Sequence, residues 1–163
     1  MKRDAFPGLI FLVSAIFLAN TPIALANSAS RSAADEDNAR EAVIRDLARD
    51  FSDATMTIFV SIDGKAASDQ FIQRFRDFKN PVKKDPKTEG FSDENGTGHL
   101  QNKSTKEPGV ILNVEKLQWI SKSEIEMDGS YSCGALCGGG STFRVVLKAG
   151  KWVAHPVGPI WAS

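Results

Sequence analysis

The chain has no excess charge and few of the residues that most often carry chemistry. Twenty lysines and arginines balance twenty aspartates and glutamates over 163 residues. A near-neutral surface has no basic field to hold a nucleic acid or an anionic lipid, so we expect neither partner. The two cysteines and two histidines are the whole Cys and His supply for a zinc site: Cys133, Cys137, His99 and His155. They include only one close-spaced pair, so we predict no metal centre.

The sequence also contains an incomplete version of the phosphate-binding loop motif. The stretch from Gly134 to Ser141 has glycines near the required spacing, but it lacks the lysine that should precede the serine. That lysine supplies the charge that holds the phosphates of a nucleotide. We therefore expect no nucleotide and no other cofactor.

Long hydrophobic runs are scarce, and the longest lies near the N-terminus. It extends from Phe6 to Ala19 after a basic start at Lys2 and Arg3, and Ala24-Leu25-Ala26 offers a cleavage site. The run is shorter than the roughly 20 residues that a membrane span needs. This order predicts a cleaved signal peptide over residues 1–26. We expect an exported protein, periplasmic or extracellular, with no membrane span after cleavage.

The first half of the remaining chain predicts helices around one strand. Residues 27–35 resemble a flexible arm, and apolar positions at helical spacing predict a helix over 36–51. Alternation predicts a strand over 56–62, closed by a turn at Asp63-Gly64. A shorter helix over 69–78 follows, with Ser68 as its N-cap. Its phenylalanines, Phe71, Phe75 and Phe78, are typical of core packing.

The second half predicts a sheet. Residues 80–109 form a long polar loop in which His99-Leu100-Gln101 is expected to be a short edge strand. Four half-apolar strands follow as an antiparallel meander, with a bulge near Glu115-Lys116 to repair the alternation. The tail that ends in Trp161-Ala162-Ser163 is expected to pack across the sheet. We thus predict a single α+β domain over 36–163, with the first helix on a bent antiparallel sheet.

The most specific chemical feature is the pair Cys133 and Cys137. Two cysteines in an exported chain usually form a disulfide, and a turn of three intervening residues brings them into range. The alternative is a redox-active dithiol, although that motif usually has two intervening residues before a helix.

Acid–base candidates are scattered. Glu124, Glu126 and Asp128 share one face of a strand, which suits calcium binding, an acid–base pair or, more simply, a solvated sheet face. Asp63 and His155 are the best remaining acid and base. With the aromatic residues of the C-terminal half they define a tentative pocket: Asp63, Trp119, Tyr131, Trp152 and His155.

The C-terminal half also resembles a recurring bacterial pattern. The segments that carry the resemblance are Gly129-Ser130-Tyr131-Ser132-Cys133-Gly134, Leu136-Cys137-Gly138, Gly150-Lys151-Trp152 and Trp161-Ala162-Ser163. They resemble a group of small, exported, largely uncharacterised proteins, and the likeness covers about residues 56–163. More loosely, a helix before a bent sheet is similar to the cone of nuclear-transport-factor-two-like and cystatin-like domains. The resemblance implies a fold and no catalytic group.

These observations favour a non-enzymatic binding module for a small ligand, peptide or envelope partner, held in a hollow between the first helix and the sheet. Two alternatives stay open. One is a pocket-type hydrolase or isomerase that uses an acid–base pair, and the other is a thiol-redox protein that uses Cys133 and Cys137.

Overall fold

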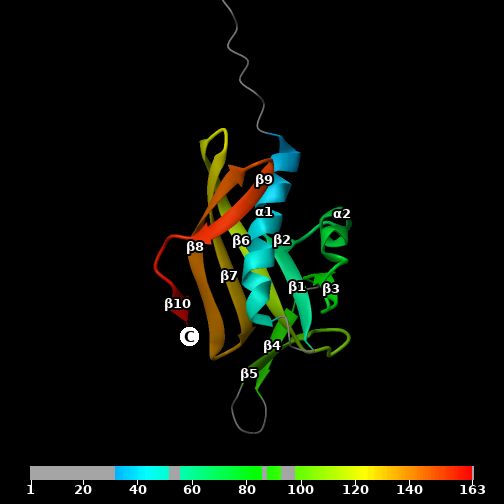
Figure 1. The fold of residues 1–163 in the computed structure, drawn as a ribbon. Coiled ribbons are helices and arrows are strands. Elements are labelled where there is room, and N and C mark those ends of the chain that lie inside the picture. The colour runs from blue at the N-terminus through cyan, green and yellow to red at the C-terminus, as the bar shows by residue number, and fades with distance from the viewer. Residues whose placement is uncertain (1–31, 52–55, 86–87, 93–97, 163) are drawn as a thin grey trace, which may run out of the picture.

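The computed structural model describes residues 32–51, 56–85, 88–92 and 98–162. One long helix lies against a strongly curved sheet (Figure 1), which confirms the α+β class. The predicted signal peptide lies outside the described residues. Within those residues, no helix is both long and apolar enough to cross a membrane.

The helix α1 spans Ala33–Leu47 and begins three residues earlier than predicted. The reason is its cap: the Ser32 hydroxyl accepts the Asp35 N–H at 3.0 Å, and Asp35 and Glu36 add negative charge to the first turn. Residues 33–35 of the predicted arm are therefore helical, and residues 27–31 lie outside the described residues. A 3-10 turn, η1 (Ala48–Phe51), follows the helix.

The predicted first strand is confirmed as β1 (Thr57–Ile62). Asp63 and Gly64 both have positive φ, 50° and 69°, and they return the chain into β2 (Lys65–Ala66) as a two-residue hairpin. Asp63 tolerates this conformation because aspartate is one of the side chains that enter the left-handed region at low cost.

The second helix is shorter than predicted. Ser68 caps it as expected, but α2 covers only Asp69–Ile72 and continues as the 3-10 turn η2 (Gln73–Phe75). Phe71 and Phe75 are buried, so the phenylalanine stripe packs in the core as predicted. Arg45 of α1 fixes the next turn: its guanidinium binds Asp77 at 2.9 Å and lies over the rings of Phe75 and Phe78.

The long loop contains more structure than one edge strand. The strand β3 (Val82–Lys84) runs parallel to β1. The strands β4 (Thr88–Ser92) and β5 (Gly98–Asn102) form a separate two-stranded sheet, and β5 includes the expected 99–101 segment. In Figure 1 this hairpin projects from the lower end of the main sheet.

The predicted meander is confirmed. Its strands are β6 (Gly109–Ser121), β7 (Glu124–Gly134), β8 (Cys137–Lys148) and β9 (Lys151–Pro156), and each is antiparallel to the next. The predicted bulge is present, because the register between β6 and β7 shifts between Glu115 and Gln118. The tail forms β10 (Trp161–Ala162), which lies along β8 beyond the end of β9.

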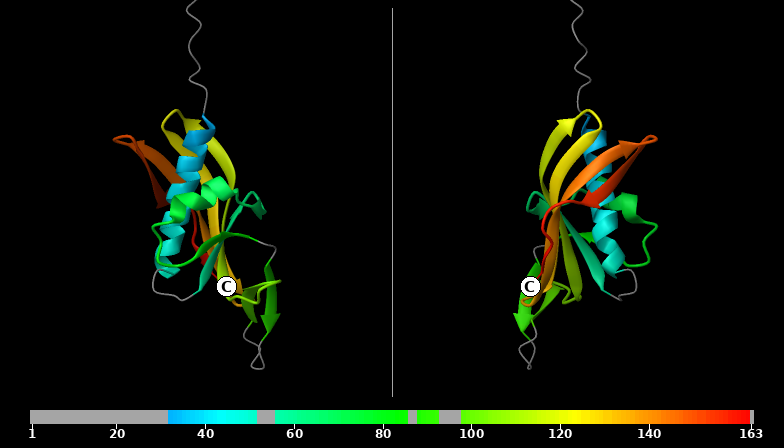
Figure 2. Two further views of the ribbon diagram at one scale, coloured as in Figure 1. Left: turned by 90° about the vertical axis from the view of Figure 1, so that its right-hand side faces the viewer. Right: turned by 60° about the vertical axis from the view of Figure 1, so that its left-hand side comes forward.

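The sheet is mixed rather than wholly antiparallel. Its order is β10-β8-β7-β6-β1-β2, with β3 beside β1 and β9 beside β8. The strand β1 joins β6 in parallel, since the chain between them carries β3 and the β4–β5 hairpin before it returns. Figure 2 shows the resulting curvature from two sides.

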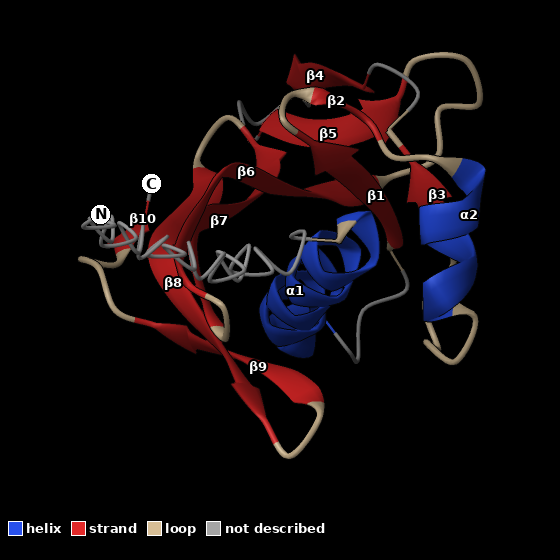
Figure 3. Cartoon of the chain, turned by 90° about the horizontal axis from the view of Figure 1, so that it is seen from above, coloured by secondary structure: helices blue, strands red, loops and turns tan. Residues whose placement is uncertain are grey.

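The core lies between α1 and the inner face of this curve (Figure 3). Val43, Ile44 and Leu47 of α1 are buried against the sheet. The helix comes close to the sheet at Gly129 of β7, where an added Cβ would lie 2.7 Å from Val43 Cγ1 and 2.7 Å from the Phe143 ring. Glycine at this position lets the helix sit directly on the sheet.

We predict that Gly129→Ala destabilises the fold by about 1–3 kcal/mol, because the added methyl group overpacks the contact between α1 and β7. Chemical denaturation measures the change. Adding Val43→Ala to Gly129→Ala should recover part of the loss, while Ser132→Ala on the same strand serves as the control. Additive effects of the two core substitutions would contradict the predicted contact.

Candidate functional site

The centre of the predicted hollow between the first helix and the sheet is filled by side chains. The inner-face residues Leu112, Ile125 and Val145 are all fully buried against α1 and its neighbours. Space for a ligand is found instead at the flanks of α1 and on the outer face of the sheet. Three grooves mark these places.

The first, which we call the apolar groove, lies at the C-terminal end of α1. It has a volume of about 240 Å³, and its apolar lining comes from Ala48, Ile58 and Phe78. Charged and polar residues surround this lining: Arg45, Arg49, Asp77, Lys79 and Asn80. Three cations against one carboxylate give the lining a net positive charge. Arg45 is held in place by Asp77 and by Glu41 at 2.8 Å. Both carboxylates raise the pKa of Arg45, and Asp77 has the larger effect.

The second, the tryptophan groove, lies between α1 and the β8–β9 turn. It measures about 340 Å³ and includes Trp152 and Lys151. The Trp152 ring meets Trp119 edge to face, with 5.8 Å between ring centroids. The indole of Trp119 donates to Glu36 at 3.1 Å, and that of Trp152 donates to Asp35 at 3.4 Å. Both tryptophans thus fasten the start of α1 to the sheet, a structural role that suits their partial burial.

The five residues of the tentative pocket do not form one site. Trp119 and Trp152 are together, but Tyr131 packs edge to face on Phe51 at the opposite end of α1, with centroids 5.2 Å apart. Asp63 lies in the β1–β2 turn, 4.0 Å from Arg40. His155 is exposed on β9, with Nε2 3.3 Å from Lys148 Nζ. The strands β6, β7 and β8 lie between Asp63 and His155, so the proposed acid and base are separated by the strand order.

The third, the outer groove, lies on the face of the sheet away from α1. It measures about 300 Å³ and contains Asp128, Ser130, Thr142 and Trp161. Asp128 accepts from Lys116 Nζ at 2.9 Å and from Thr142 Oγ1 at 2.8 Å. Both hydrogen bonds favour the charged carboxylate and lower the pKa of Asp128, and the bond from Lys116 has the larger effect.

The other two carboxylates of this strand are also paired. Arg144 of β8 binds Glu124 at 3.0 Å and Glu126 at 2.8 Å. This cross-strand pairing favours the solvated-face interpretation over a calcium site. Among the described residues, no group of three or more His, Cys, Asp or Glu side chains is placed to hold a metal ion.

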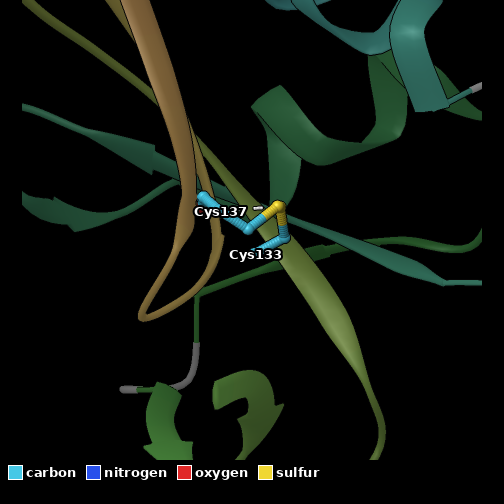
Figure 4. The surroundings of a disulfide bond; sticks show 2 residues. All are labelled: Cys133 and Cys137. Atoms are coloured by element: carbon cyan, nitrogen blue, oxygen red, sulfur yellow. Dashed lines mark hydrogen bonds between the residues drawn. A yellow bond between two sulfur atoms is a disulfide. The ribbon is translucent and has the colours of Figure 1, made fainter. Parts of the chain in front are cut away.

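The two cysteines form the predicted disulfide (Figure 4), with 5.1 Å between their Cα atoms. It closes the hairpin between β7 and β8, so the turn falls at Ala135-Leu136. The glycines 138–140 follow Cys137 within β8. Cys133 is only 8% exposed and packs in the core.

Two features of these grooves were not predicted from the sequence. The cationic rim of the apolar groove joins Arg49 of η1 to Lys79, which are far apart in sequence. The position of Trp161 over Gly140 depends on how the tail pairs with β8. The sequence did predict a tail packed across the sheet. That prediction was the one signal that pointed to the second feature, the position of Trp161.

Comparisons with family models, with curated proteins and with solved structures found no match for this chain.

We predict that the double variant Cys133→Ser, Cys137→Ser still folds but loses about 2 kcal/mol of stability, because the small loop restrains the unfolded chain only modestly. Alkylation with intact mass before and after reduction should show both thiols blocked in the wild type. Thermal denaturation gives the stability difference. Thiols that are free and rapidly alkylated in the native protein would contradict the structural role and favour the redox alternative.

The lowered pKa of Asp128 predicts a defined pH dependence. Its carboxylate contributes stability above its unfolded pKa of about 3.9, and this contribution is lost as pH falls through the lower folded value. Asp128→Asn should therefore be less stable than wild type at neutral pH, and the gap should narrow below about pH 4. Denaturation curves from pH 7 to acid measure it, with the exposed Asp50→Asn as control. A gap that does not change with pH would refute the assignment.

Proposed function

We propose that this protein is an exported, non-enzymatic binding module that takes a small apolar ligand with an anionic end in the apolar groove. The observation that carries the proposal is an apolar lining with three cations and a single carboxylate around it. Ligand sites commonly combine apolar walls with a few placed polar groups.

The apolar part of the ligand is matched by Ala48, Ile58 and Phe78. Burying apolar surface contributes roughly 25 cal/mol per Å², so this lining supplies affinity without directional contacts. The open end of the groove lets a chain longer than the cavity extend into solvent.

The anionic end is matched by Arg49 and Lys79. Arg45 is already engaged by Asp77 and Glu41, so it shapes the wall. Arg49 forms an ion pair with Asp46 at 2.9 Å, but its side chain is 75% exposed. Such a pair is worth at most about 1 kcal/mol, so a ligand carboxylate can compete for it. Within the described part of the chain, Lys79 has no ion pair.

The two alternative functions have less support. A hydrolase or isomerase of the predicted type needs Asp63 and His155 together, and three strands lie between them. A thiol-redox protein needs an accessible cysteine, and here Cys133 is buried in the core and Cys137 is partly buried against it. Export rests on the predicted signal peptide, and a disulfide is compatible with an oxidising compartment.

The test is calorimetric titration of the purified protein with octanoate, in parallel with 1-octanol as the neutral counterpart. We expect octanoate to bind and octanol to bind more weakly. The double variant Arg49→Glu, Lys79→Glu should weaken octanoate binding about tenfold, because two exposed charge contacts become repulsive.

The matched control is Arg76→Glu, which makes the same type of charge change at an exposed position outside the groove lining. It should bind octanoate as the wild type does. Equal affinity of wild type and the double variant, or no binding of octanoate at all, would overturn the proposal.

A further inference from the structure

The outer groove has a chemistry different from that of the apolar groove, and it lies on the other side of the sheet. Figure 3 shows α1 inside the curve of the sheet and β10 outside it. The groove is bounded by the tail through Pro159 and Trp161, and by the outward side chains of β6, β7 and β8. It shares no lining residue with the apolar groove.

The strand register places the groove side chains in rows. Asn113, Ser130, Gly140 and Trp161 are successive register partners from β6 to β10. Glu115, Asp128 and Thr142 form the next row. Rows of hydroxyl and carboxylate groups thus lie beside one aromatic side chain.

Gly140 is what lets the indole lie on the sheet. An added Cβ there would lie 3.0 Å from Trp161 Nε1 and 2.7 Å from the Gly129 carbonyl oxygen. The absence of a side chain at Gly140 leaves room for the ring, and Trp161 remains 51% exposed. A large aromatic ring held in place and half exposed beside a polar groove is typical of a binding surface.

The polar groups retain capacity for a ligand. Asp128 accepts from Lys116 and Thr142, which leaves about two of the four acceptor positions of a carboxylate. Lys116 has three donors and gives one to Asp128. In the part of the chain that the structure describes, the Ser130 hydroxyl has no hydrogen-bond partner.

We infer that the outer groove binds a neutral saccharide, stacked on Trp161 and hydrogen-bonded by Asp128, Lys116 and Ser130. A sugar ring presents an apolar C–H face to an indole and hydroxyls that both donate and accept. One cation against two carboxylates, Glu115 and Asp128, disfavours an anionic ligand. The polar floor disfavours a purely apolar one. The volume of about 300 Å³ is at the small end of ligand sites, which suits a short sugar unit.

The experiment is a glycan array followed by saturation-transfer NMR on the full exported chain, with neutral disaccharides such as cellobiose, maltose and N,N′-diacetylchitobiose as probes. We expect at least one neutral glycan to bind and to shift the tryptophan fluorescence. Trp161→Ala should weaken that binding about tenfold or more. The control Ile160→Ala removes a neighbouring exposed side chain that is outside the groove lining, and it should bind as the wild type does.

A second variant, Lys116→Gln with Ser130→Ala, keeps the test decisive if Trp161→Ala disturbs the fold. It leaves the tail and its pairing intact and should weaken the same glycan severalfold, while the melting temperature falls only by the small amount expected for loss of the Lys116–Asp128 ion pair. The inference fails if no neutral glycan binds, if these variants bind as the wild type does, or if a peptide binds in a Trp161-dependent way while glycans do not. This inference does not depend on the apolar groove.

Discussion

The direct contact between α1 and the sheet at Gly129 determines where a ligand can bind. Because β7 has no side chain at this point, Val43 descends to the strand and the inner face closes on the helix. The space that the curved sheet would otherwise enclose is therefore core. Available surface lies at the edges of α1 and on the outer face, and the three grooves are found there.

The charged side of α1 has a structural role as well as a solvent-facing one. Arg45 joins Glu41 to Asp77, and Arg74 of η2 returns to Glu41 at 2.9 Å. Each of these partly exposed pairs is worth little alone, but together they hold the η2 turn and Phe78 against the helix. Two members of this network, Arg45 and Asp77, also line the apolar groove, so the stability of this turn and the shape of the groove are coupled.

Local patterns in the sequence predicted the positions of the helices and strands better than they predicted which strands pair. Alternation fixed the strands of the meander, and the change of parity after Val114 indicated the bulge at Glu115-Lys116. The Ser68 cap and the closing disulfide are equally local. The parallel pairing of β1 with β6 is not, because periodicity shows which face of a strand is buried but not which strand lies beside it. The strand order separates Asp63 from His155. Of the five predicted pocket residues, Trp119 and Trp152 are the two that are in contact.

Two glycines of β8 determine how the C-terminal tail lies on the sheet. Gly139 and Gly140 are register partners of Ala162 and Trp161. Side chains at these glycines would collide with Tyr131 on one face and with Trp161 on the other. The glycine run therefore acts on both faces of β8: it admits the Tyr131–Phe51 contact on the inner face and the indole on the outer face. Since an exposed apolar side chain adds nothing to the core, the exposed half of Trp161, like the exposed Val157 and Ile160 of the same tail, is not explained by packing alone.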